Sequence, residues 1–122
     1  MKCEILSVGT ELLLGDILNT DAQFLARELA AMGFTMQHQA TVGDNPERLR
    51  EAVEHALSRS DIIITSGGLG PTADDITKEI CAEVMGIPLV LHEESLQRML
   101  DFFSHRKSGM PETNRKQAYL PD

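Results

Sequence analysis

The amino-acid sequence predicts an α/β protein, a three-layer α/β/α sandwich with a mostly parallel, doubly wound sheet. Two observations support this prediction. Short apolar runs alternate along the chain with segments whose apolar residues recur at helical spacing, and glycines and prolines separate the two kinds of segment. Strands that alternate with helices in this way form a parallel sheet with helices on both faces.

The first predicted pair of elements is a strand followed by a helix. Residues Cys3 to Val8, with Ile5, Leu6 and Val8, have the pattern expected for a buried strand. Thr20 and Gln23 have the spacing of a capping box, which predicts that Thr20 caps the next helix. Gly33 follows the last residue of the helical pattern and is expected to end that helix.

Two further strand–helix pairs follow. Thr35 to Val42 is a weaker, more polar strand, which favours a place nearer the sheet edge. Asn45 and Pro46 suit the cap and the first position of the second helix. The third strand spans Ile62 to Thr65, and a helical pattern runs from Ile76 to Met85.

The last third of the chain is less regular. Pro88 to Leu91 predicts a short fourth strand, and an apolar stripe ending at Phe103 predicts a fourth helix. From Arg106 to Asp122 the pattern fades into a polar tail. We expect the strand order 2-1-3-4, which makes the first and third strands neighbours.

Composition limits the classes of partner. The chain has 122 residues and a formal net charge of −8, which argues against non-specific binding to nucleic acid or to anionic membranes. It contains neither an apolar run of membrane-spanning length nor a signal-peptide pattern, so we expect a cytoplasmic protein with no membrane partner. Cys3 and Cys81 fall in core patterns and predict reduced thiols.

The most informative stretch lies between the third strand and its helix. Gly67, Gly68 and Gly70 allow positive φ and a close approach of the backbone to a ligand. A glycine-rich turn before a helix N-terminus is a common way to hold a phosphate. Asp74 and Asp75 follow, and two carboxylates beside a phosphate are explained if Mg²⁺ bridges them. The alternative is a plain structural turn with one Asp as a helix cap.

Other loops are expected at the same edge of the sheet. Because the carboxyl ends of parallel strands share one edge, Glu11 should lie near the two aspartates and bind metal or ligand. Lys78, about one turn into the helix, either contacts a phosphate or is an ordinary surface residue. The histidines have no metal-ligand spacing, and no Ser–His–acid arrangement can be argued.

Three stretches resemble the motifs of CinA-type (competence/damage-inducible) proteins, in the same order. They are Val8–Gly15, Thr41–Asp44 and Thr65–Thr77. The wider superfamily has the molybdopterin-binding fold of the molybdenum-cofactor proteins MoaB and Mog. The resemblance implies a single CinA-type N-terminal domain over residues 1–122, truncated at its C-terminal end.

The resemblance also implies an activity. CinA-type domains are expected to act as metal-dependent pyrophosphohydrolases that convert ADP-ribose, or a related nucleoside diphosphate sugar, into AMP and a sugar phosphate. The alternative is a non-catalytic module that binds a pterin phosphate such as molybdopterin. The sequence does not distinguish adenine from pterin recognition. In either case we expect a small-molecule ligand, no nucleic-acid partner, and a homo-oligomer.

We assign the residues to roles on this basis. Asp74 and Asp75 are the predicted catalytic residues, and together with Glu11 they are the predicted ligands of Mg²⁺ or a similar divalent ion. The predicted phosphate- and ligand-binding residues are Gly9, Thr10, Glu11, Asp44, Ser66, Gly67, Gly68, Gly70, Pro71, Thr72 and Lys78. Asp21 stands where the family usually has Asn, which adds a negative charge near the site.

Overall fold

The structure, a computed structural model, describes residues 1–122. Its centre is a parallel three-stranded sheet in the order β2-β1-β3, formed by β2 (Thr35–Val42), β1 (Lys2–Val8) and β3 (Ile62–Ser66). The prediction that the first and third strands are neighbours is confirmed, and so is the edge position of the second strand.

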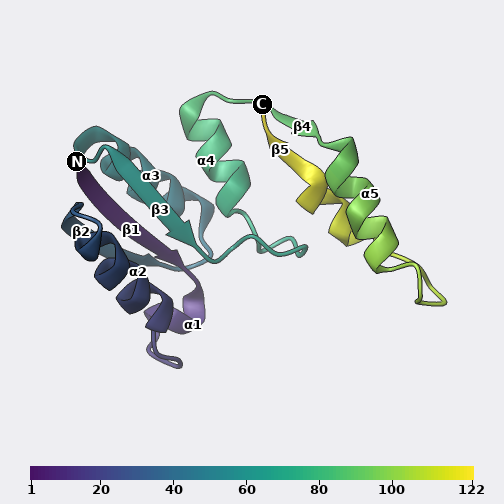
Figure 1. The fold of residues 1–122 in the computed structure, drawn as a ribbon, viewed down its shortest axis with the longest axis horizontal. Helices are drawn as coiled ribbons and strands as arrows, with labels where there is room; N and C mark the ends of the chain where they lie inside the picture. Colours follow the sequence, from purple (N-terminus) through teal and green to yellow (C-terminus); the bar gives the residue numbers. More distant parts are fainter.

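Helices cover both faces of this sheet, which confirms the three-layer α/β/α architecture (Figure 1). On one face, Cys3 and Ile5 of β1 pack against α2 (Thr20–Ala31). On the other face, Leu6 and Val8 pack against α3 (Pro46–Arg59) and α4 (Thr77–Met85). Because side chains alternate along a strand, the central strand must be apolar on both faces, as the sequence shows.

The helix ends follow from local chemistry, with one correction. The predicted cap at Asn45 and the predicted stop at Gly33 are confirmed, and Gly33 has positive φ. Gly86, which follows the last residue of α4, also has positive φ. The predicted Thr20 cap is wrong, because Asn19 caps α2 and its side-chain oxygen accepts a hydrogen bond from the N–H of Ala22 at 3.2 Å. None of the helices is both long and apolar enough to cross a membrane.

The last third of the chain forms a separate antiparallel unit. It contains β4 (Leu89–Leu91), α5 (Glu93–Phe102), the 3-10 helix η1 (Glu112–Ala118) and β5 (Tyr119–Pro121). Figure 1 shows this unit beside α4, away from the three-stranded sheet.

Two sequence predictions for this region are therefore wrong. The strand predicted over Pro88–Leu91 does not join the parallel sheet, because its backbone groups pair with β5, where Val90 lies opposite Leu120. The polar tail is not patternless, since it contains η1 and β5. No strand in the structure pairs with the outer edge of β3.

An ion pair between the buried Glu4 and the exposed Arg59 lies at the end of the sheet opposite the strand carboxyl termini. Glu4 of β1 is 1% exposed. Its carboxylate accepts hydrogen bonds from the guanidinium of Arg59 and from the hydroxyl of Ser60, the latter at 2.9 Å. The Arg59 hydrogen bond is the main reason that the pKa of Glu4 is lowered. Since Glu4 lies on a face that is otherwise apolar, its charge requires these partners.

Candidate functional site

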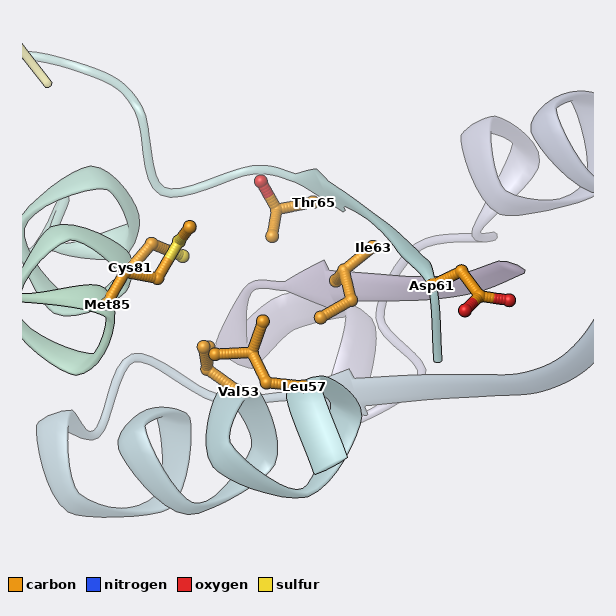
Figure 2. A pocket seen from close by; sticks show the side chains of 7 residues that line it. All are labelled: Val53, Leu57, Asp61, Ile63, Thr65, Cys81 and Met85. Carbon is orange, nitrogen blue, oxygen red and sulfur yellow. The ribbon is translucent and has the colours of Figure 1, made fainter. Parts of the chain in front are cut away.

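The larger of two cavities in the molecule is apolar and lies away from the glycine-rich loop. It has a volume of about 340 Å³ and lies between α3, β3 and α4 (Figure 2). Val53 and Leu57 enter from α3, and Cys81 and Met85 enter from α4. Burial raises the pKa of the Cys81 thiol, which makes it a poor nucleophile. This cavity offers few polar groups to orient a ligand.

The second cavity lies at the carboxyl ends of β1 and β3, where an open α/β sheet places its ligands. Its volume is about 290 Å³. Ser66 and Gly67 form one part of its wall, and Leu12, Ile17 and Leu18 supply apolar groups. Its full lining is Val8, Glu11, Leu12, Ile17, Leu18, Asn19, Thr20, Asp21, Ser66 and Gly67.

The glycine-rich loop begins at this cavity with two residues in the left-handed region. Gly67 has φ 91° and Gly68 has φ 69°. A Cβ on Gly67 would lie 2.1 Å from the carbonyl oxygen of Val8, and one on Gly68 would lie 2.0 Å from Oγ1 of Thr77. Both positions therefore require glycine for conformation and for space.

Thr77 fixes the start of the loop to the start of α4. It is 1% exposed, and its hydroxyl donates a hydrogen bond to the carbonyl of Gly67 at 2.8 Å. Its backbone N–H donates to the carbonyl of Gly68 at 3.1 Å. The backbone N–H groups of Gly67, Gly68 and Leu69, in contrast, have no hydrogen-bond acceptor within the chain. In other proteins, successive backbone N–H groups without a partner in the chain can bind an anion.

Asp75 has a structural role within the loop. Its Oδ2 accepts hydrogen bonds from the backbone N–H of Thr72 at 3.0 Å and from the Thr72 hydroxyl at 2.7 Å. The Thr72 hydrogen bonds are the main cause of a lowered pKa for Asp75, so the carboxylate is held in its charged form. A Cβ on Gly70 would lie 2.7 Å from the same oxygen, so a larger residue there would displace the carboxylate of Asp75.

The three predicted metal ligands do not form one cluster. No group of three or more His, Cys, Asp and Glu side chains in the structure could hold a metal ion. Glu11 lines the cavity with Ser66 and Gly67, whereas neither Asp74 nor Asp75 does. The expected proximity of Glu11 to the aspartate pair is therefore not found. Asp74 is exposed and makes no hydrogen bond or ion pair.

The other two predicted loops do meet at this edge. The hydroxyl of Thr10 donates to Oδ2 of Asp44 at 3.3 Å and accepts from the backbone N–H of Asp44 at 3.2 Å. The N–H of Gly9 donates to the carbonyl of Val42 at 2.8 Å. Thr10 and Asp44 therefore join the loops after β1 and β2, rather than lining the cavity.

Lys78 does not extend toward the free amides of the loop. Its Nζ donates to the backbone carbonyl of Lys116 at 2.6 Å. Burial is the main cause of the lowered pKa of Lys78. Pro71 is half-buried within the loop.

Sequence reasoning missed two parts of the site. The first part is the loop before α2, where the cavity is lined by Ile17, Leu18 and Asn19. Two apolar residues in a loop, followed by an Asn that can cap a helix, could have indicated this part of the site from the sequence. Asn19 also donates to the Ser7 hydroxyl at 2.8 Å, which ties this loop to β1. Lys116 contacts the glycine-rich loop from a segment that had no recognisable pattern, and no sequence signal indicated it.

Comparison with known proteins shows the family and the fold of the chain. The family described as "Probable molybdopterin binding domain" matches residues 4–119. The chain therefore belongs to the molybdopterin-binding domain family. Within that family its relatives are CinA proteins. A CinA-like protein of Dictyoglomus turgidum is 62% identical over 120 residues, which are 98% of this chain and 29% of that protein. The chain thus spans less than a third of the length of this curated relative.

Solved structures show the same relationship. The chain is similar to the protein CinA of Thermoplasma acidophilum, with a TM-score of 0.89 and 31% identity, over 98% of this chain and 70% of the other. It also has the fold of the molybdopterin biosynthesis enzyme MoaB of Thermus thermophilus, with a TM-score of 0.67 and 21% identity, over 98% of this chain and 78% of the other. The CinA resemblance and the fold predicted from sequence are both confirmed.

Proposed function

We propose that this domain binds a pterin phosphate of the molybdopterin type without transforming it. The observation on which the proposal rests is the set of free backbone N–H groups at Gly67, Gly68 and Leu69, beside a cavity with apolar walls. The amides would bind the phosphate, and Ile17 and Leu18 would cover a flat ring. The family match and the MoaB-like fold support a ligand of this class.

The carboxylates that line the cavity could bind the ring edge of the pterin, at the end away from the phosphate. Glu11 and Asp21 both line the cavity. A pterin ring presents an amino group and ring N–H donors, and carboxylates accept hydrogen bonds from such donors. The ring edge would thus face the carboxylates while the phosphate faces the amides at Gly67.

Titration calorimetry with matched ligands tests the proposal. A pterin phosphate is titrated into the protein, and the same pterin without phosphate serves as control. We expect saturable binding of the phosphorylated compound and much weaker binding of the control. Equal binding of both compounds, or binding unchanged by Gly67→Ala in a folded variant, would contradict the proposed role of the loop.

The second candidate is hydrolysis of ADP-ribose with a divalent ion. The charged Asp75 and the exposed Asp74 favour it, because both could provide carboxylate oxygens. An Mg²⁺ ion there would take its remaining ligands from the phosphates of the substrate and from water, and it would polarise a phosphoryl oxygen. The ammonium of Lys116 contacts the carbonyl of Asp75, and a positive charge at that place disfavours a cation. We therefore rank this candidate second.

Product analysis separates the two candidates. The protein is incubated with ADP-ribose and Mg²⁺, Mn²⁺ or Co²⁺, and AMP is measured. The binding proposal expects no AMP above the level of a metal-only control. AMP formation that is lost in Asp74→Asn would establish the hydrolase instead.

A further inference from the structure

One side chain from the last third of the chain holds the glycine-rich loop. The Nζ of Lys116, in η1, donates hydrogen bonds to the backbone carbonyls of Thr72 and Asp75. The neighbouring Gln117 donates to the carbonyl of Leu69 at 3.4 Å. For residues 69–75, every hydrogen bond from outside the loop comes from Lys116 or Gln117.

The charged ammonium of Lys116 is used on the loop rather than in an ion pair. No carboxylate lies within ion-pair distance of its ammonium, so the charge is directed at neutral carbonyl groups. An ammonium has three donors, and two are used by the loop. Its field also contributes to the lowered pKa of Asp75. In turn, the carbonyl of Lys116 accepts from Lys78 of α4, so η1 is tied to the loop and to the helix that follows it.

We propose that Lys116 is a positioning residue that holds the glycine-rich loop in its ligand-binding shape. Residues 69–75 have no strand or helix partners of their own, and a loop without outside contacts samples many conformations. Lys116 holds the carbonyls of Thr72 and Asp75, in the part of the loop that precedes α4. Thr77 holds Gly67 and Gly68, in the part that follows β3. The free amides are thereby pre-organised for an anion. The ligand part of this proposal rests on the proposed function.

The variants are Lys116→Met, Lys116→Arg and the control Arg115→Met. Arg115 lies next to Lys116 in η1, is half-buried like it, and makes no hydrogen bond or ion pair. Lys116→Met removes the donors and keeps much of the apolar stem. Lys116→Arg restores a charged donor. Thermal unfolding of all three variants shows whether the fold is intact.

The first readout is hydrogen exchange of the loop amides, which needs no ligand. In Lys116→Met we expect the amides of Thr72 and Asp75, which have acceptors within the loop, to exchange about 10-fold faster or more, with β1 and β3 unchanged, because charged hydrogen bonds to the loop are lost. Arg115→Met should match the parent, and Lys116→Arg should recover part of the protection. Exchange in Lys116→Met that equals the parent, or that rises equally in Arg115→Met, would overturn the proposal.

The second readout is titration with a pterin phosphate. We expect binding to weaken by about 10- to 100-fold in Lys116→Met, with partial recovery in Lys116→Arg. A loosened loop with unchanged affinity would overturn the role of Lys116 in binding. If the parent itself binds no pterin phosphate, the proposed function fails, and hydrogen exchange still decides whether Lys116 positions the loop. If Lys116→Met does not fold, Lys116→Arg and Gln117→Ala are each compared with the parent instead. Both should show faster exchange in the loop and weaker binding, to a smaller extent than expected for Lys116→Met.

Discussion

Gly68→Ala tests whether the loop has the shape seen here. The Cβ added at Gly68 would lie 2.0 Å from Oγ1 of Thr77 and 3.2 Å from its Cβ. Thr77 is 1% exposed and its hydroxyl is bound to the carbonyl of Gly67, so it cannot move aside freely. A left-handed conformation costs a non-glycine residue about 1–2 kcal/mol. Overpacking at a buried contact adds about 1–3 kcal/mol.

Gly109→Ala is the matched control, because Gly109 has the same φ of 69° and a Cβ there would meet nothing within 4 Å. Gly109→Ala should lower the unfolding free energy only by the cost of the left-handed conformation, about 1–2 kcal/mol. The unfolding free energy of each variant is measured by urea denaturation, with far-ultraviolet circular dichroism as the probe. Gly68→Ala should be less stable than Gly109→Ala by about 1–3 kcal/mol. Equal losses in the two variants would refute the contact with Thr77.

Three further predictions concern other parts of the molecule. Glu4→Gln should lower the unfolding free energy at pH 7 by about 1–3 kcal/mol, because a charged acceptor of Arg59 is lost. The pKa of Glu4 in the folded protein is lowered from its ordinary value of 4.5, so Glu4 stabilises the fold fully above pH 4.5. This stabilisation is lost as the pH falls through the lowered pKa. The unfolding free energy of Glu4→Gln, measured by urea denaturation, should therefore depend less on pH in acid than that of the parent. Asp75→Asn should leave the circular-dichroism spectrum unchanged, since Asn can still accept from Thr72, and should abolish any Mg²⁺-dependent part of ligand binding; an unchanged Mg²⁺ titration would count against Asp75 as a metal ligand. The unpaired outer edge of β3 should cause concentration-dependent self-association in sedimentation velocity, and a single monomeric species at all concentrations would contradict this.

The parallel sheet could be predicted from sequence because its signals are local and strong. The strands predicted at Cys3–Val8 and Ile62–Thr65 match β1 and β3 closely, and each is followed by a loop or helix start with recognisable chemistry. The order of the first three strands followed from the general rule for such sheets, whereas β4 lies outside this sheet. The positions of Gly67 and Gly68 were predictable for the same reason, since few residues other than glycine suit such a turn.

What the sequence did not reveal depends on contacts between distant segments. β4 has only three residues, and nothing in Leu89–Leu91 indicates that β5 is its partner. Lys116 lies 41 positions from Asp75, and its role depends on where η1 packs. The two aspartates were predicted to act together, but Thr72 binds Asp75 within the loop and leaves Asp74 exposed.

The most direct test of the binding site is a residue-resolved titration by nuclear magnetic resonance. A pterin phosphate is added to ¹⁵N-labelled protein, and the amide shifts of all residues are followed. We predict that the largest changes occur at Gly67, Gly68 and Leu69, whose N–H groups have no partner in the chain, and at Ile17 and Leu18. Saturable changes confined to another surface, such as the apolar cavity around Cys81, would contradict the account.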